Sequence, residues 1–371
     1  IAPAHAAYYA RIVRGKWDLR RLIEAAGADI HDAYHAGEMG DDGTTEVLAN
    51  AERRLMTLLS RSNLPRPATA AQVAAEVAKA ATDPDADMGP VFGTGFWEID
   101  DSLSGLRPGD LMIVAGRPGT GKTSLALCMA HAMCGGAQKL GALFVSRETA
   151  RTRLMHRHLS IASDVPAKLI RAGGLAGHDA DRVLEAAKKI ETQALVIDDQ
   201  TIRSVTQLAS NVKLLRHRHR IDVVFVDYLQ RMQPPEGRRY SSGEERIAAV
   251  SEAMKDIALS EQVAIVCLAQ LNRELLKRDD TRPRLSDLRG SGQIEQDADV
   301  IALMHRPWLY LTREQQGERF GERGVTAVHF DKTRDAGQFS VVLDFHPETT
   351  KFSSLSPIVD QQMSFEQEVP F

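Results

Sequence analysis

The sequence has few of the features that mark secreted, metal-binding or membrane-spanning chains. It holds only three cysteines, Cys128, Cys134 and Cys267, with no CxxC pair. This excludes a disulfide framework or a zinc knuckle and favours a reducing, cytoplasmic compartment. The 12 histidines form no HExxH motif, and those among arginines, such as His156 and His158, are predicted to lie on solvated basic helix faces. No apolar stretch approaches the roughly 20 residues that span a bilayer, so we expect no membrane association.

Other absences concern the start of the chain, its charge and its regularity. The printed sequence opens at Ile1 without methionine and shows no apolar signal-peptide core, so we expect a truncated chain or an ordered fragment. The formal net charge is only -4, and nucleic-acid binding would therefore need a local basic surface. We find no internal repeat and no low-complexity tract. With 371 residues, 43% of them hydrophobic, the chain is long enough for several globular domains.

The hydrophobic pattern predicts a helical hairpin, a linker, a large α/β region and a tail, at residues 1–60, 61–92, 93–356 and 357–371. In the hairpin, a helical period over 12–35 is interrupted by Gly15 and Gly27, and a second amphipathic run spans 45–59. In the linker, the alanine-rich residues 69–82 predict a helix.

From about Phe96 the pattern changes to short, continuous apolar runs separated by helical segments. Such runs are typical of parallel strands that are buried on both faces. They begin at Leu111, Ala142, Ala194, Val223, Val263 and Asp299. The later runs VTAVHFD, FSVVLDF and KFSSL are joined by turn sequences and predict hairpin strands that extend the sheet. The predicted fold class is therefore α/β, with a mostly parallel central sheet.

A glycine-rich segment between the first predicted strand and a helix has the pattern of a phosphate-binding loop. It comprises Gly116, Arg117, Pro118, Gly119, Thr120, Gly121, Lys122, Thr123 and Ser124. The glycines let backbone N–H groups form an anion nest at a helix N-terminus, which suits the phosphates of ATP. Lys122 would reach the β and γ phosphates, and Thr123 would offer a hydroxyl to Mg²⁺. The flanking strand and helix favour this interpretation over an ordinary glycine-rich turn.

Three polar residues end or follow other predicted strands. Asp227 ends VVFVD, where its carboxylate would either hold Mg²⁺ or cap the next turn. Glu148 follows ALFVS and would either activate the attacking water or lie in the first turn of a helix after a Ser146 cap. Gln270 closes the run from Val263, where its amide would either report the γ-phosphate or simply end the strand.

Two basic segments are candidates for contacts beyond the subunit's own nucleotide. The segment LSDLRGSGQIEQDAD combines Arg289 with Gly290 and Gly292, and it predicts a mobile loop that suits the backbone of single-stranded DNA. Lys332 and Arg334 lie two apart at a strand end and are expected to point the same way, as phosphate-seeking cations do. A surface turn and solvated charge are the respective alternatives.

In order and spacing, these motifs resemble the DnaB family of bacterial and phage replicative helicases, with a RecA-like P-loop ATPase fold. The resemblance covers most of residues 93–354, through TGFWEIDDSLSGLRPGDLMIVAGRPGTGKT, FVSRET, VVFVDYLQRM, LAQLNRELLKR, RPRLSDLRGSGQIEQDADVI and DKTRDAG. It implies a homo-hexameric, ATP- and Mg²⁺-dependent DNA helicase that translocates 5′ to 3′ on single-stranded DNA. Primase, a helicase loader and single-strand-binding protein are the further partners it suggests.

The resemblance also implies roles for single residues. It makes Lys122 and Thr123 the ligands of phosphate and Mg²⁺, Glu148 the catalytic base, Asp227 the second acidic position and Gln270 the γ-phosphate sensor. It makes Lys332 and Arg334 the pair that enters a neighbouring subunit's site, and Arg289, Gly290 and Gly292 the DNA-contacting loop.

The sequence departs from the family pattern in two places. Residues 1–60 resemble only the last helical hairpin of the family's N-terminal domain, and Gly290 stands where relatives often carry an acidic residue. Residues 69–82 resemble the linker helix that packs on the next subunit.

Alternative functions on the same core are a RecA-like recombinase that forms an open filament and an ATP-gated loader or assembly module that does not unwind DNA. The tail sequence SFEQEVPF resembles the acidic tip of bacterial single-strand-binding proteins, and a disordered end is the alternative there.

Overall fold

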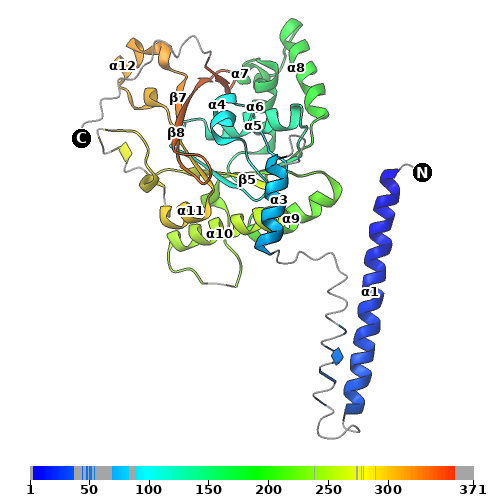
Figure 1. Ribbon diagram of the computed structural model, residues 1–371. Coiled ribbons are helices and arrows are strands. Elements are labelled where there is room, and N and C mark those ends of the chain that lie inside the picture. The colour runs from blue at the N-terminus through cyan, green and yellow to red at the C-terminus, as the bar shows by residue number, and fades with distance from the viewer. Residues whose placement is uncertain are drawn as a thin grey trace. The chain divides into compact units, whose positions relative to one another are not determined.

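The computed structural model describes most of the chain, shown in Figure 1. The described residues are 3–36, 44, 47, 48, 50, 51, 54, 69–82, 89–237, 239–272, 275, 276, 278, 280–288 and 290–355. The chain divides into two compact units, Ile1–Met88 and Gly89–Phe371. Within the described residues, no helix combines the length and the apolar character needed to cross a membrane. The C-terminal tail 357–371 lies outside them.

The first unit begins with one long helix, α1 (Pro3–His35). This helix starts before the predicted period and continues through Gly15 and Gly27, so the expected interruptions are wrong. Glycine inside a helix costs roughly 1 kcal/mol relative to alanine. The flanking residues of α1 therefore continue the helix past both positions.

A return segment contacts α1 through paired charges. Arg54 donates to the carboxylates of Asp29 and Asp32, each at 2.6 Å, although most of the predicted second run, 45–59, lies outside the described residues. Helix α3 (Ala70–Thr82) is found where the linker helix was expected.

The second unit is built on a nine-stranded sheet with the spatial order β3-β2-β4-β5-β1-β6-β7-β8-β9. The strands are β1 (Leu111–Gly116), β2 (Ala142–Ser146), β3 (Leu195–Asp198), β4 (Val223–Asp227), β5 (Ala264–Gln270), β6 (Val300–His305), β7 (Val325–Thr333), β8 (Phe339–His346) and β9 (Lys351–Ser354). Strands β1 to β6 pair in parallel, and β7 to β9 are added antiparallel. The predicted α/β class with a mostly parallel sheet is confirmed.

Helices cover both faces of this sheet (Figure 1). They are α4 (Trp97–Leu103), α5 (Lys122–Gly135), α6 (Arg151–Ser163), α7 (Ala167–Ala172), α8 (Gly177–Glu191), α9 (Val205–Arg218), α10 (Gly243–Glu261), α11 (Ser291–Asp297) and α12 (Arg313–Glu318). Short 3-10 turns are η2 (Leu229–Arg231), η4 (Leu285–Asp287), η5 (Pro307–Tyr310) and η6 (Phe320–Glu322).

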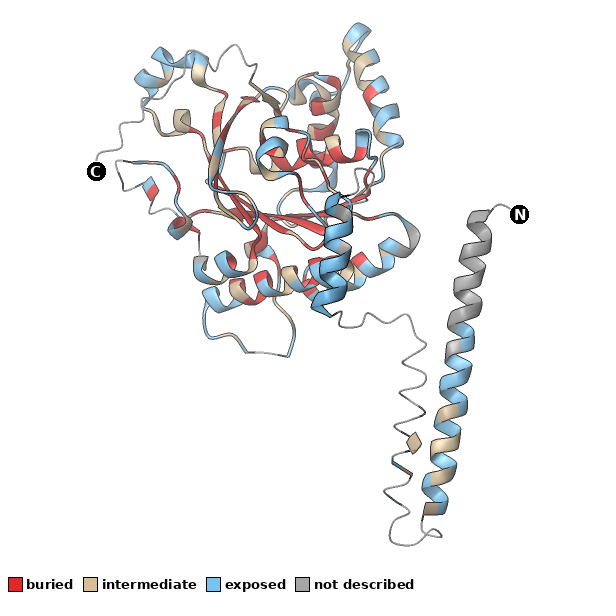
Figure 2. Ribbon diagram, viewed as in Figure 1, coloured by how far each residue is buried: buried red, intermediate tan, exposed pale blue. Residues whose placement is uncertain are grey.

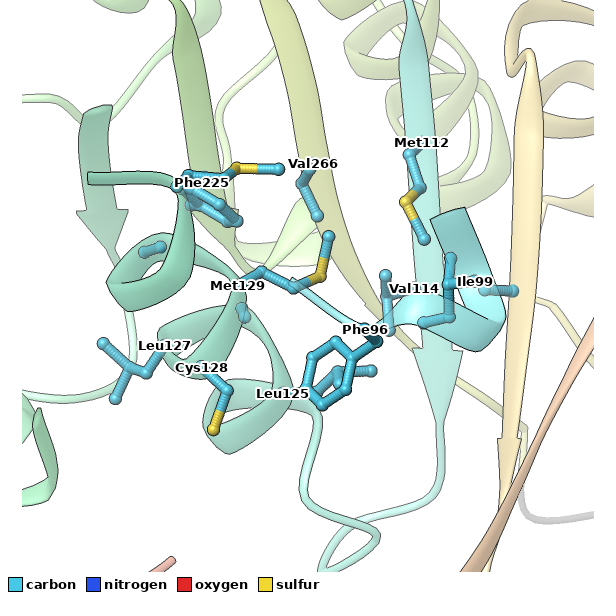
Figure 3. Packing of buried hydrophobic residues seen from close by; sticks show 14 of the residues in the cluster. Phe96, Ile99, Met112, Val114, Leu125, Leu127, Cys128, Met129, Phe225 and Val266 are labelled. Carbon is cyan, nitrogen blue, oxygen red and sulfur yellow. The ribbon is translucent and has the colours of Figure 1, made fainter. Parts of the chain in front are cut away.

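The central strand β1 is buried on both faces and divides the core into two clusters (Figure 2). Its residues Met112 and Val114 belong to the cluster that contains α4 and α5, whereas Ile113 belongs to the cluster with α9, α10 and α11. Figure 3 shows Leu125 and Met129 of α5 packed on the first side. Burial on both faces explains why β1, β2, β4, β5 and β6 are continuous apolar runs in the sequence.

Parallel pairing gives the sheet two chemically different edges. We call the edge where β1, β2, β4, β5 and β6 end the carboxyl edge, and the edge where they begin the amino edge. Strand β7 runs the other way, with Thr333 paired to Val300 at the start of β6, and so it ends at the amino edge. Arg334 follows β7, which is an interior strand of the sheet between β6 and β8.

Candidate active site

The glycine-rich segment forms a tight loop between β1 and α5 at the carboxyl edge. Gly121 precedes α5 with φ 101°, and a Cβ there would lie 2.9 Å from the Phe352 ring, so only glycine fits without movement. Buried Thr120 donates to the Arg117 carbonyl at 2.8 Å and closes the turn. The first-turn amides of α5 have no partner within the helix, and such amides at a helix N-terminus commonly bind anions.

Lys122 occupies the inside of this loop. Its Nζ donates to the carbonyls of Gly116 at 2.8 Å and Arg117 at 3.1 Å. Burial lowers the pKa of Lys122 to about 8, against the opposing charges of Asp227 and Glu148. The ammonium is thus held only by neutral carbonyls, and an anionic phosphate would be a stronger partner for it.

Asp227, at the end of β4, is joined to the first turn of α5. Its Oδ2 accepts from the Thr123 hydroxyl at 2.9 Å, and the residue is 2% exposed. Burial raises the pKa of Asp227, and the Thr123 hydrogen bond opposes that shift. Among the described residues, no three His, Cys, Asp or Glu side chains form a metal cluster. Mg²⁺ is commonly held by one or two protein oxygens together with substrate phosphates, and Thr123 with Asp227 offers that donor set.

Glu148 lies in the connection between β2 and α6, exposed to solvent. The Ser146 hydroxyl accepts from the Thr149 amide at 3.0 Å, but α6 begins only at Arg151. The alternative of a first-turn helix glutamate is therefore wrong. The Glu148 charge raises the pKa of Lys122, so this carboxylate is near the phosphate loop.

Arg157 of α6 is a half-buried cation that motif reasoning missed. Burial lowers its pKa, while the charges of Asp227 and Glu148 raise it. The surrounding RTRLMHRH was interpreted as a solvated basic face. His158 of the same helix contradicts that interpretation, because it is 0% exposed. It lies 3.0 Å from His131 of α5, and burial lowers the pKa of His158 to about 4.

Gln270 ends β5 directly opposite Gly116, the first residue of the phosphate loop. Its backbone amide donates to Gln230 Oε1 at 3.2 Å, and Gln230 Nε2 donates back to the Gln270 carbonyl at 3.3 Å. The next residue, Leu271, forms an antiparallel bridge with Leu288. Gln270, opposite the phosphate loop, and Leu271, which pairs with the candidate DNA segment, are therefore adjacent in the chain.

The candidate DNA segment is more regular than the predicted mobile loop. It forms η4 and α11, and Gly292 belongs to the first turn of α11. Gly290 precedes α11 with φ 76°, and a Cβ there would lie 3.1 Å from the Ile247 side chain. An L-residue would be strained at this position. Arg289 lies outside the described residues.

A second missed residue, Arg306, follows β6 and supports the phosphate loop. It is 4% exposed, donates to the Gly119 carbonyl at 3.4 Å and lies 4.7 Å from the centre of the Phe345 ring. Its Nε and Nη2 donate to the Arg323 carbonyl at 2.9 and 2.8 Å. All these partners are distant in sequence, so no local pattern could reveal the contact.

Lys332 and Arg334 lie at the amino edge, away from Lys122. Lys332 Nζ donates to the Glu295 carbonyl of α11, and Arg334 Nε lies 3.0 Å from Asp299 Oδ1. A register irregularity in the β6–β7 pairing precedes them. The two cations therefore engage separate partners, which lie only four residues apart in the chain; that they point the same way stays a prediction.

Comparisons with known proteins agree with this arrangement. Residues 92–354 match the family described as the DnaB-like helicase C-terminal domain. The replicative DNA helicase DnaB of Leifsonia xyli is 34% identical over 359 residues, which cover 96% of this chain and 75% of that protein. The replicative DNA helicase DnaC of Bacillus subtilis is 30% identical, with coverage of 95% and 75%.

Two solved structures are similar across the sheet. The ATPase domain of G40P aligns with a TM-score of 0.70 and 27% identity, covering 78% of this chain and 100% of that one. A DnaB-like replicative helicase, described with its interactions with primase, aligns with a TM-score of 0.69 and 25% identity, covering 94% and 79%.

Proposed function

Because this chain belongs to the DnaB-like helicase family, and is thus an ATP-dependent DNA helicase, we propose that it works as a hexameric ring. In this proposal the ring moves 5′ to 3′ on single-stranded DNA and excludes the other strand of the duplex. The observation that carries the proposal is the distribution of charge over one sheet, with the phosphate loop at the carboxyl edge and Arg334 at the amino edge. Neither the recombinase filament nor the non-unwinding module accounts for the family match as well.

In the proposed reaction, each residue of the carboxyl edge has a distinct task. Lys122 exchanges its two carbonyl partners for the β and γ phosphates of ATP, and Thr123 and Asp227 hold Mg²⁺. When bound, Mg²⁺ neutralises charge on the phosphate oxygens. The exposed Glu148 orients the attacking water and accepts its proton.

Loss of the γ-phosphate would be reported through Gln270. Gln270 ends β5 opposite Gly116 of the phosphate loop, and Leu271 would pass any displacement to Leu288 by the backbone bridge. We assign DNA contact to Arg289 and to the backbone of Gly290 and Gly292, because first-turn amides of a helix are free to bind phosphate oxygens. This series of contacts supports coupling between ATP hydrolysis and DNA binding.

Arg334 cannot serve the phosphate loop of its own subunit. Strand β1 has six residues and separates the two edges by roughly 20 Å at about 3.3 Å per residue. An arginine supplied by a neighbour stabilises the charge on the transferred phosphoryl group, with effects of roughly 10³ to 10⁵ in rate in other phosphate-hydrolysing systems. The proposed active site is therefore completed only between subunits.

Mixed rings test the shared site. Arg334→Ala subunits keep the phosphate loop, and Lys122→Ala subunits keep Arg334, so a mixture should regain ATPase activity that neither variant shows alone. The two kinds of subunit carry tags of different size, so that gel filtration verifies that the rings are mixed. Mixed rings as inactive as their components would refute the shared site.

Translocation polarity has its own assay. A forked duplex with only a 5′ single-stranded tail should be unwound in the presence of ATP and Mg²⁺, and a duplex with only a 3′ tail should not. Lys122→Ala protein provides the matched control. Unwinding from the 3′ tail alone would reverse the proposed polarity, and ATP hydrolysis without unwinding of either substrate would favour the loader alternative.

The remaining parts of the chain are assigned by the same proposal. Residues 1–60 and 61–92 would form the end of an N-terminal domain and a linker between subunits, with 93–356 as the ATPase domain. The solved relative described with primase supports primase as a partner. A helicase loader and single-strand-binding protein complete the proposed partners, the latter through the tail 357–371.

A further inference from the structure

The amino edge carries a buried carboxylate with a defined set of partners. Asp299 directly precedes β6, and its side chain is 7% exposed. Its Oδ2 accepts from the Leu111 amide at 2.7 Å and from Lys255 Nζ at 2.6 Å. Its Oδ1 lies 3.0 Å from Arg334 Nε. One carboxylate thus connects the start of β1, helix α10 and the arginine after β7.

The partners of Oδ2 are rigid, and they fix the direction of Oδ1. Leu111 is 0% exposed and begins the central strand. Lys255 is 14% exposed in its side chain and also donates to the Gly109 carbonyl at 2.8 Å. Because both donors hold the same oxygen, the carboxylate plane cannot turn without breaking a buried contact. Oδ1 therefore faces Arg334 Nε in a fixed direction.

Asp299 holds Arg334 through its backbone amide and its Nε atom, and leaves the Nη end of the guanidinium open. Its backbone amide donates to the Asp299 carbonyl at 3.0 Å, and its Nε engages Oδ1 of the same residue. The side chain is 52% exposed. A guanidinium carries donors on Nη1 and Nη2 as well as on Nε, and the two Nη groups form the fork that matches phosphate oxygens. This ion pair at Nε restrains the guanidinium and does not occupy its Nη fork.

We propose that Asp299 is a positioning residue for Arg334, aiming the guanidinium fork before a neighbouring subunit's nucleotide reaches it. The assignment rests on the proposed shared site. A side chain that is already oriented loses less conformational freedom when the reacting geometry forms, so the arginine acts on the phosphoryl group without first having to be ordered. Misplacement of such a group by about 1 Å lowers rates by roughly 100-fold in known cases.

Asp299→Asn is suited to separate positioning from support of the fold. An asparagine offers one acceptor oxygen and one NH₂ donor in place of two acceptors. The Leu111 amide and Lys255 together favour the oxygen on their side. The NH₂ group then faces Arg334 Nε, and the negative charge that attracts the guanidinium is gone. The substitution therefore releases Arg334 while the contacts to β1 and α10 remain.

The experiment places Asp299→Asn in one kind of subunit at a time within mixed rings. The reference is the mixture of Lys122→Ala and Arg334→Ala subunits, in which only the former donate an arginine and only the latter hydrolyse ATP. Asp299→Asn in the arginine-donating subunits should lower ATPase activity roughly 10- to 100-fold. In the ATP-hydrolysing subunits, which lack Arg334, it should lower activity far less.

Asp110→Asn is the matched control, introduced into the arginine-donating subunits. Asp110 lines the same cavity of about 570 Å³ as Asp299 and Arg334, but its Oδ2 accepts from the Arg107 amide at 2.6 Å. This variant should keep the activity of the reference mixture. Thermal unfolding and gel filtration of every subunit check folding and assembly.

The outcomes distinguish a failure of the positioning role of Asp299 from a failure of the proposed shared site. Equal loss from both placements of Asp299→Asn means that Asp299 supports the subunit fold, and loss from neither means that Arg334 needs no positioning; either result overturns the assignment. A reference mixture without activity refutes the shared site itself, and with it this inference.

Discussion

The two edges of the sheet hold their charges in different ways. At the carboxyl edge, the Lys122 ammonium has only backbone carbonyls as hydrogen-bond partners, and the Asp227 carboxylate is joined to a neutral hydroxyl. At the amino edge, the Asp299 carboxylate is paired directly with the cations Lys255 and Arg334. The carboxyl edge would therefore gain partners if nucleotide bound there, whereas at the amino edge Asp299 is already paired and Arg334 is 52% exposed.

In the proposed shared site, this difference would make a single subunit insufficient for ATP hydrolysis. Parallel strands place their carboxyl ends together, which gathers Lys122, Thr123, Asp227 and Gln270 from distant parts of the chain. An antiparallel strand added beside β6 ends at the other side, so it delivers Arg334 where no phosphate loop of the same subunit can use it. In the proposed ring, assembly would bring the two kinds of edge together.

Lys122→Ala is the most severe test of the carboxyl edge. It should abolish ATP hydrolysis, because alanine removes the ammonium that the Gly116 and Arg117 carbonyls hold inside the phosphate loop. Burial lowers the pKa of Lys122, so its charge is unfavourable to the fold, and the thermal unfolding temperature of nucleotide-free protein should not fall. Phosphate release and differential scanning fluorimetry measure the two effects. Near-normal turnover would remove the phosphate-loop assignment.

Glu148→Gln tests the same edge with a smaller expected loss. The amide keeps the shape of the side chain but cannot accept a proton, so hydrolysis should fall roughly 100-fold or more. ATP binding should survive, as measured with a fluorescent nucleotide. Weak binding combined with normal turnover of the ATP that does bind would make Glu148 a structural residue and leave the base unassigned.

The sequence was sufficient to predict the strands and the carboxyl edge for a physical reason. Strands buried on both faces must be continuous apolar runs, and a phosphate loop needs its glycines in one local pattern. Strand ends at the carboxyl edge then follow from the parallel topology, so Asp227 and Gln270 could be selected from position alone. Their roles remain predictions, although their locations agree with them.

The amino edge could not be predicted in this way. The Asp299 to Arg334 pair depends on β7 lying beside β6, and chain order alone does not specify that neighbour. The buried pair of His131 and His158 likewise depends on how α5 packs on α6. Gly290 suggested a loose loop, although its positive φ serves as the start of a helix. Such features arise from tertiary contacts rather than from local pattern.

Protonation of Lys122 gives a third, smaller effect at the carboxyl edge. Its pKa is about 8 in the free protein, against an ordinary value of 10.5, so nucleotide-free protein should gain stability as pH rises through this window. Anionic phosphates favour the charged form, so ATP binding above about pH 8 should take up a proton and weaken by up to about tenfold per pH unit. Calorimetry near pH 9 in two buffers of different ionisation enthalpy measures the uptake. Equal uptake by Lys122→Ala would assign the proton to another group.

The smallest expected effect concerns stability at the amino edge, where Arg334→Ala should lower the free energy of unfolding by less than about 1 kcal/mol. The Arg334 side chain is 52% exposed, and exposed ion pairs contribute roughly 0.2 to 1 kcal/mol. Asp299 also keeps its contacts with Leu111 and Lys255. Lys255→Ala provides the comparison, because that pair is 14% and 7% exposed and breaking a buried pair costs about 3 to 5 kcal/mol. Urea unfolding of nucleotide-free protein at one protein concentration measures both. If Arg334→Ala proved as destabilising as Lys255→Ala, Arg334 would be a structural residue of its own subunit. The proposed contrast between the carboxyl edge, which binds nucleotide, and the amino edge, which supplies Arg334 to a neighbour, would then fail.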